Sequence, residues 1–188
     1  MPTVDPIADA QAARPALRQG RHIAAEASIT VARPLDRFDR WFQHVALEDI
    51  LLGHGSIPAI THTAMIAGTW SEPGARRRVF MADGSSVLEE VIAQDRPHYF
   101  AYMVWGFGGL IGRLAAYGRG EFFTQARGDG ATEIRWVYSF APRSALAALP
   151  LALIVRAAFR PFMRASIDTI RRVAEERIEL PGTALAAA

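Results

Sequence analysis

The stretch that decides the fold is PLALIVRAAFRPFMRASIDTIRRVAEER, which runs from Pro150 to Arg177. Its large apolar residues recur at steps of three and four, so they share one stripe of an α-helix. They are Val155, Phe159, Phe162, Met163, Ile167, Ile170, Val173 and Ala174. Because a lone helix must bury such a stripe against another layer, the sequence predicts a sheet beneath this helix.

Pro161 stands inside the predicted helix. Proline has no N–H to donate to the carbonyl of Ala157, so we expect the helix to bend at residues 157–161. Such a bend would wrap the helix around the sheet and open space beneath it.

The composition indicates one domain that needs neither a metal nor a disulfide, and a chain of 188 residues with no cysteine fits this description. All the basic residues are arginines, and 21 of them against 19 acidic residues give a net charge of only +2. Nucleic-acid binders normally show a stronger basic bias, so we expect no nucleic-acid partner.

The two ends of the chain are expected to be flexible, as an arm over residues 1–20 and a tail over residues 178–188, around a single domain at 21–177. The first twenty residues lack the positive region and apolar core of a secretory signal. The apolar run from Ala145 to Val155 is about half the length that a bilayer span requires. We therefore expect a soluble, cytoplasmic protein, either a monomer or a homodimer.

Short strands separated by turns fill the chain ahead of the long helix. Alternation predicts a first strand at 21–31, followed by a short helix capped by Asp36 and a second one from about Leu47 to Leu52. Six further strands are predicted, at 63–70, 76–81, 85–93, 98–105, 121–126 and 131–140, which makes about seven in an antiparallel sheet. The glycine-rich stretch 106–120 is expected to be a flexible flap at a pocket mouth or, alternatively, a loop or short helix that caps the sheet.

The order of strand, two short helices, six strands and long helix is that of the α+β helix-grip fold. Three segments carry a closer resemblance: EPGARRRVFMADGSSVLEEV (Glu72 to Val91), FAYMVWGF (Phe100 to Phe107) and GATEIRWVYSFAP (Gly130 to Pro142). In these segments and the helix after them, the chain resembles the START-like, Bet v 1-like superfamily (SRPBCC), and in particular its bacterial polyketide cyclase/dehydrase-like branch. The resemblance implies a cavity between the sheet and the C-terminal helix. Lipid carriers, cyclases, hormone receptors and chaperone activators share this scaffold, so the function has to be argued from the site.

Aromatic and apolar side chains are predicted to line that cavity. On the last strand Ile134, Trp136 and Tyr138 alternate with polar residues and should face inward. The strand at 98–105 is apolar on both faces, so alternation does not select its inner face. The predicted ligand-binding set is Trp70, Arg78, Tyr99, Met103, Trp105, Phe107, Ile134, Trp136, Tyr138, Val155, Phe159, Phe162 and Met163. The alternative is that these side chains simply fill a core.

Two adjacent glutamates, Glu89 and Glu90, point to opposite faces of their strand, so one of them should face the cavity. A carboxyl group in an apolar pocket can serve as a general acid or base, and Tyr102 joins the two glutamates as a candidate catalytic residue. The alternative is a cross-strand ion pair with the arginine row 76–78. An inward arginine of that row could also clamp a carboxylate or phosphate head group.

Three functions follow as hypotheses. The first is binding of a hydrophobic small molecule, lipid-like or aromatic and polyketide-like. The second is a cyclase or dehydratase, a lyase or isomerase that uses the inward glutamate and needs no cofactor. The third is an interaction module that docks on a partner or a membrane surface through Phe107, Leu110 and Ile111. The histidine spacing fits no ligand signature, so we expect no metal.

Overall fold

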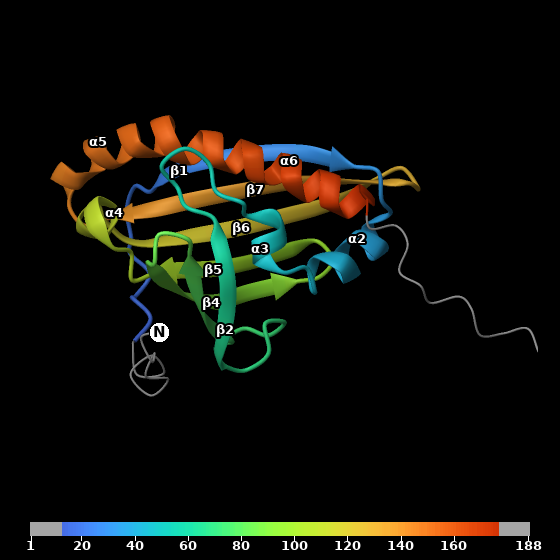
Figure 1. The fold of residues 1–188 in the computed structure, drawn as a ribbon, viewed down its shortest axis with the longest axis horizontal. Helices are drawn as coiled ribbons and strands as arrows, with labels where there is room; N and C mark the ends of the chain where they lie inside the picture. The colour runs from blue at the N-terminus through green and yellow to red at the C-terminus, as the bar shows by residue number, and fades with distance from the viewer. Residues whose placement is uncertain (1–12, 177–188) are drawn as a thin grey trace, which may run out of the picture.

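The computed structural model describes residues 13–176. A seven-stranded antiparallel sheet, in the order β1-β7-β6-β5-β4-β3-β2, curves beneath one long helix (Figure 1). The strands are β1 (Ile23–Val31), β2 (Ile60–Ala67), β3 (Arg76–Met81), β4 (Ser86–Asp95), β5 (Tyr99–Trp105), β6 (Ala115–Arg127) and β7 (Ala131–Pro142). The helices are α2 (Leu35–Phe42), α3 (Leu47–Ile50), α4 (Gly109–Leu114), α5 (Ala145–Ile154), a π-helical turn η1 (Val155–Phe159) and α6 (Arg160–Glu176). The predicted helix-grip fold is confirmed.

The long helix begins earlier than the sequence suggests and changes its winding where a bend is predicted. Ser144 caps it, accepting a hydrogen bond from the N–H of Ala147. At η1 the helix widens, and the N–H of Arg160 bonds to the carbonyl of Val155, five residues back. Pro161 has no N–H to donate, so the regular hydrogen-bond pattern is interrupted there, and the adjacent π turn accommodates this interruption within the helix. The helix therefore widens locally at the predicted position, and the bend itself stays a prediction.

The two short helices between β1 and β2 lie at the α6 end of the molecule (Figure 1). Phe38 of α2 is buried and stacks on Phe42 with ring centroids 5.4 Å apart. The prediction that Asp36 caps this helix is wrong, because the cap is Pro34, and Asp36 lies in the first turn, paired with Arg40. An acidic residue in a first turn still favours the helix through its dipole.

The glycine-rich stretch is only partly a loop. It contains the short helix α4, and its second half is already strand, because β6 starts at Ala115. Two of its glycines, Gly118 and Gly120, belong to this strand, and a tyrosine ring lies close over each of them. A Cβ on Gly118 would stand 2.3 Å from the hydroxyl oxygen of Tyr138, and one on Gly120 would stand 2.2 Å from Cζ of Tyr102. Glycine here provides room for cross-strand rings.

The main core lies between the inner face of the sheet and the helix. Tyr138 and Phe140 of β7 meet Phe159 of the helix at centroid distances of 4.7 Å and 4.9 Å. Trp136 stacks on Phe122 at 5.3 Å and meets Phe162 edge-on at 6.5 Å. These rings account for much of the burial that holds the helix in place.

Part of the arm at residues 13–20 contacts the outer face of the sheet. The backbone N–H of Arg18 donates to the Tyr117 hydroxyl at 2.9 Å, and Arg14 pairs with Glu90 at 2.9 Å. The remainder of the expected arm and the whole expected tail lie outside the described residues.

We expect Gly118→Ala to lower the free energy of unfolding by about 1–3 kcal/mol, since the new methyl group overlaps a Tyr138 ring held between Phe140 and Phe159. Urea denaturation measures the loss. Gly130→Ala is the matched control, because a Cβ there meets nothing within 4 Å. Equal free energies of unfolding for the two variants would contradict the close packing of the Tyr138 ring against Gly118.

Candidate functional site

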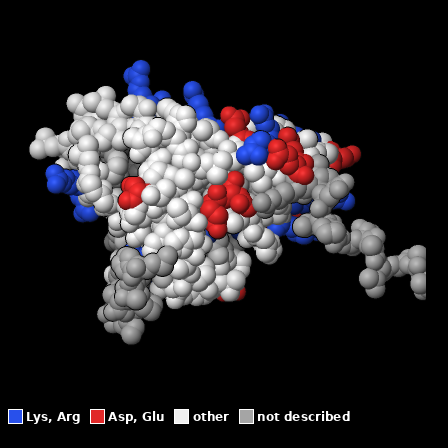
Figure 2. Space-filling model, viewed as in Figure 1, with Lys and Arg blue, Asp and Glu red and all other residues white. Residues whose placement is uncertain are grey.

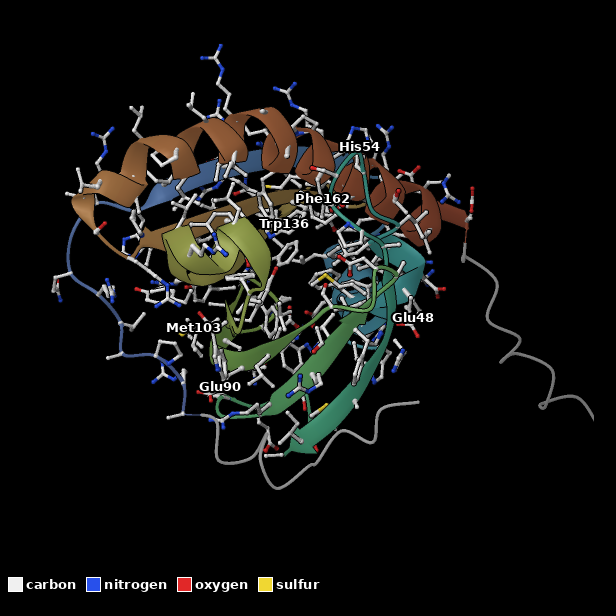
Figure 3. All side chains as sticks on the ribbon, turned by 60° about the vertical axis from the view of Figure 1, so that its left-hand side comes forward. Glu48, His54, Glu90, Met103, Trp136 and Phe162 are labelled. Atoms are coloured by element: carbon white, nitrogen blue, oxygen red, sulfur yellow. The ribbon has the colours of Figure 1, made fainter. Side chains whose placement is uncertain are left out.

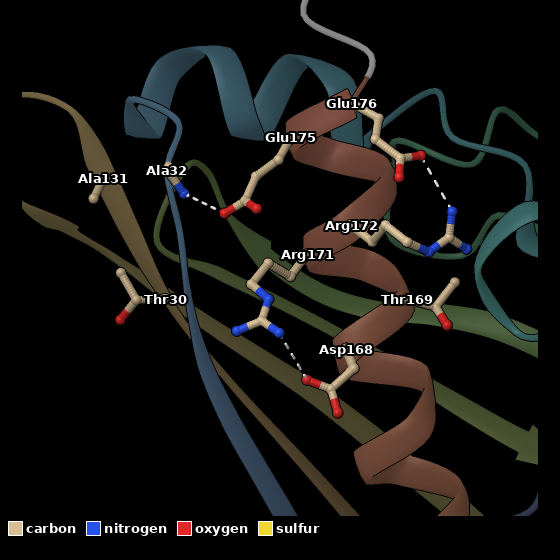
Figure 4. Close-up of a pocket in the computed structure, with 9 residues that line it drawn as sticks. All are labelled: Thr30, Ala32, Ala131, Asp168, Thr169, Arg171, Arg172, Glu175 and Glu176. Carbon is tan, nitrogen blue, oxygen red and sulfur yellow. Dashed lines mark hydrogen bonds and ion pairs between the residues drawn. The ribbon is translucent and has the colours of Figure 1, made fainter.

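One hollow of the described structure is on the outside. It measures about 840 Å³ and lies between the edge strand β1, the start of β7 and the last turns of α6 (Figure 4). It is open to solvent, and its charges are mostly paired: Arg171 with Asp168 at 3.4 Å and Arg172 with Glu176 at 3.1 Å. Glu175 accepts a hydrogen bond from the N–H of Ala32 at 2.8 Å. This hollow is a solvated groove, away from the aromatic interior.

The candidate site is a smaller interior cavity of about 60 Å³ between the sheet, α6 and the two short helices. Its walls are mostly apolar, with a few polar groups among them, the usual make-up of a small-molecule site. Its lining comprises Phe42, Gln43, Val45, Leu47, Ile50, Leu51, Trp70, Arg77, Glu89, Arg96, Phe100, Tyr102, Phe122, Trp136 and Ile170. Strands supply Arg77, Glu89 and Tyr102, while α2, α3 and the residues beside them supply a thin, mostly apolar wall.

An ion pair between Arg77 and Glu89 forms the main polar feature. The two residues are directly opposite in the β3–β4 pairing. Nε and Nη2 of Arg77 lie 2.8 Å and 2.7 Å from Oε2 of Glu89. Oε1 of Glu89 has no hydrogen-bond partner among the described residues. The guanidinium also stacks over Trp70, 3.5 Å from the ring centroid, which holds the pair in one orientation.

Tyr102 and Trp136 form a second polar feature. Burial, and then the charge of Glu89, raises the pKa of Tyr102 far above the usual phenol range, so its hydroxyl stays protonated and can donate. The indole N–H of Trp136 is near enough to that hydroxyl to oppose the rise in the Tyr102 pKa, yet it makes no hydrogen bond of ordinary geometry with any described residue. A buried donor without a partner costs about 1–3 kcal/mol.

A second ion pair stands at the rim of the cavity. Nη1 of Arg96 lies 2.8 Å from Oδ1 of Asp39, and the Gln43 amide donates to Oδ2 of the same carboxylate at 2.7 Å. This network ties α2 to the β4–β5 connection. It fixes the apolar wall that α2 and the following residues place over the cavity.

Five predicted site residues lie on the outer face of the sheet and require correction. Figure 3 shows Trp136 and Phe162 between sheet and helix, whereas Met103 and Glu90 lie toward the far side. Glu90 pairs there with Arg76 at 2.7 Å and with Arg14. The residues concerned are Glu90, Arg78, Tyr99, Met103 and Trp105. Tyr99, Met103 and Trp105 lie there because β5 turns Phe100, Tyr102 and Val104 inward, and two apolar faces left that choice open. Glu90 and Arg78 lie there because β4 turns Glu89 and β3 turns Arg77 toward the cavity.

The remaining predicted residues all face the interior, in two groups. Trp70, Trp136, Glu89 and Tyr102 line the cavity. The others pack in the aromatic core beside it: Phe107, Ile134, Tyr138, Val155, Phe159, Phe162 and Met163. The three residues predicted to dock on a partner or membrane do not share one surface. Phe107 and Ile111 pack against the core, and of the three only Leu110, 59% exposed, points outward.

Sequence reasoning named Arg77 only as one of the arginine row 76–78, and it did not name Arg96 or Gln43 as site residues. For Arg77 a signal existed: a turn at Ala82-Asp83-Gly84 pairs residue 77 with residue 89 once the hairpin is centred on Asp83. Arg96 and Gln43 meet through Asp39, which is 57 residues from Arg96, and no local pattern reveals such a contact.

The site combines a carboxylate with one available oxygen, a protonated phenol and an unpartnered indole N–H, all against apolar walls. The carboxylate can accept a proton, while the phenol and indole can donate hydrogen bonds to an oxygen atom of a bound molecule.

The free energy of unfolding should fall steeply above about pH 10, because burial raises the pKa of Tyr138, like that of Tyr102, well above its usual range. Tyrosines that ionise near pH 10 only when unfolded contribute stability that is complete below that pH and lost above it, by about 1.4 kcal/mol per pH unit each. Tyr102→Phe should remove one such contribution from the slope of unfolding free energy against pH. An unchanged slope, with phenolate absorbance already developed in the folded protein, would contradict this.

Comparisons with known proteins agree with the fold. A family model described as polyketide cyclase / dehydrase and lipid transport matches residues 22–175. The fold is similar to that of the Zhui aromatase/cyclase from Streptomyces sp. R1128, with TM-score 0.63, 16% identity and coverage of 86% of this chain and 99% of that one. It is also similar to norcoclaurine synthase from Thalictrum flavum, with TM-score 0.60, 16% identity and coverage of 86% and 100%. No curated protein matches the sequence. The chain belongs to the polyketide cyclase / dehydrase and lipid transport family.

Proposed function

We propose that the interior cavity binds a small molecule with an apolar, ring-containing body and an oxygen atom that accepts hydrogen bonds. The observation that carries this proposal is the Trp136 N–H, which is buried at the cavity without a hydrogen-bond partner in the described structure. An acceptor oxygen placed there would satisfy it, while Phe42, Phe100 and Phe122 would contact the body of the ligand.

The size of the cavity bounds the ligand. About 60 Å³ is well below the range of roughly 300–1,000 Å³ that holds a drug-sized molecule. A small phenolic or carbonyl compound requires modest expansion, and a larger ligand requires a wall to move. The candidate wall is the half-buried stretch from Val45 to Leu51, since the other sides are the sheet and α6.

The family and its neighbours support the same chemical class. The family description includes lipid transport, and one norcoclaurine synthase structure is described as a complex with dopamine and hydroxybenzaldehyde. Both of those molecules combine one aromatic ring with polar substituents.

Trp136→Phe tests the proposal by removing the N–H and keeping an aromatic ring. With hydroxybenzaldehyde as the probe, calorimetric titration should show affinity about five- to tenfold weaker than in the unmodified protein, the cost of one lost hydrogen bond.

Trp105→Phe is the matched control, since Trp105 also carries a buried N–H without a described partner, but on the outer face of the sheet. Its affinity should be unchanged. Equal effects of the two substitutions, or no saturable binding by the unmodified protein, would overturn the proposal for this class of ligand.

A second candidate function is catalysis, favoured by the free Oε1 of Glu89 beside the protonated Tyr102. The Glu89 carboxylate, oriented by its pairing with Arg77, can take a proton from the carbon next to a carbonyl group, while Tyr102 donates to the carbonyl oxygen. Cyclisation and dehydration both begin with such a proton transfer.

Glu89→Gln should abolish exchange of the α-protons of an aromatic ketone such as phenylacetone in D₂O, with a loss of about 100-fold or more, because the amide cannot act as the base. Proton NMR follows the exchange. Glu90→Gln on the outer face should keep the activity of the unmodified protein. Exchange by Glu89→Gln at the full rate would exclude this mechanism and leave binding as the function.

A further inference from the structure

The helix α5 is apolar on both of its faces. Ala147, Leu151 and the following Val155 are buried against the rest of the protein. Leu146, Leu149 and Leu153 point the other way, with 90%, 71% and 60% of their surfaces exposed. These three are spaced by three and four residues, so they form one continuous stripe on the solvent side. A helix that is apolar all round belongs in an apolar environment on both sides.

The next helix provides an internal comparison. The solvent face of α6 carries charged residues, among them Arg160, Arg164 and Asp168, and its buried face is apolar. An exposed face can therefore be polar on the same long helix. The leucine stripe is a local property of α5.

A leucine of α4 lies at the same end of the molecule. α4 contacts α5, and its Leu110 is 59% exposed. Figure 2 shows this end as a broad white surface with blue at its upper and left margins, while most of the red lies toward the other end. The exposed leucines of α4 and α5 together form what we call the α4–α5 patch: Leu110, Leu146, Leu149 and Leu153.

Arginines, without acidic residues among them, accompany the patch along the chain. Residues 143–167 include four arginines, at positions 143, 156, 160 and 164, and no Asp or Glu. Residues 106–118 add Arg113, again without an acidic residue. Arg113, Arg143 and Arg156, which flank the leucines in the chain, are all exposed.

We propose that the α4–α5 patch docks on the surface of an anionic lipid membrane, with its leucines among the acyl chains and its arginines at the lipid phosphates. Apolar side chains flanked by basic ones are the chemistry that such an interface selects. A second copy of the chain fits less well, because a two-fold contact through this patch would bring the same arginines face to face.

The helix lies on the membrane in this arrangement and does not cross it. By length and composition Ala145–Glu176 could span a bilayer. Its second half, however, buries Phe162, Met163 and Ile167 against the sheet, and spanning would expose them and the core. This inference is independent of the ligand proposed for the interior cavity.

Flotation with phosphatidylcholine vesicles, with and without phosphatidylglycerol, tests the proposal. The unmodified protein should float with the anionic vesicles and lose binding as salt is raised. Leu149→Ser/Leu153→Ser should weaken binding by about tenfold or more. Arg113→Glu/Arg156→Glu should weaken binding to the anionic vesicles by about 25-fold or more, since each arginine contributes about fivefold.

Leu52→Ser and Arg37→Glu are the matched controls, because Leu52 is 53% exposed and both residues lie outside the patch. Their binding should equal that of the unmodified protein, and circular dichroism checks that every variant is folded. Flotation unaffected by the leucine substitutions would overturn the proposal. A second result would also overturn it: the protein binds neither kind of vesicle and forms a dimer in solution that the leucine substitutions dissociate. The patch would then bind a second copy of the chain.

Discussion

The structure depends on the aromatic contact between β7 and the middle of the long helix. Tyr138 and Phe140 meet Phe159 there, and Trp136 meets Phe162. These rings leave little free volume in the central part of the interior. The cavity lies instead toward the end of the molecule where α2, α3 and the start of β3 provide part of its wall. Packing of the helix thus decides where a ligand can be held.

An ion pair inside that apolar space needs a reason. Arg77 and Glu89 are mostly buried, and taking two charges out of water costs several kcal/mol per ion before their attraction repays it, so a pair of apolar residues would often be at least as stable. The contacts around the pair limit that cost, because Arg77 also stacks on Trp70. Glu89, with one oxygen that no described residue bonds, and Tyr102, which keeps its proton at neutral pH, form a polar spot in a mostly apolar cavity.

The two ends of the long helix differ in chemistry because they meet different surroundings. α6 crosses the sheet and shows the usual division into a buried apolar stripe and a charged outer face. α5 extends past the aromatic core to the end where α4 lies, and there its outer face keeps its leucines. One continuous helix thus serves as a core element at one end and as an exposed apolar surface at the other.

The sequence by itself determined the architecture, since the three- and four-residue spacing of the long helix, the alternation of the strands and the glycine and proline turns are all local patterns. It also placed Glu89 and Glu90 on opposite faces and offered Arg77 as a partner, because residues in a short hairpin are few positions apart. Only the tertiary structure decided which face of β5 looks inward, since both of its faces are apolar and each is covered by a different layer. It alone brought Asp39 to Arg96, left the Trp136 N–H without a hydrogen-bond partner among the described residues and exposed one side of α5. These properties depend on which surfaces meet after folding, and no spacing along the chain records that.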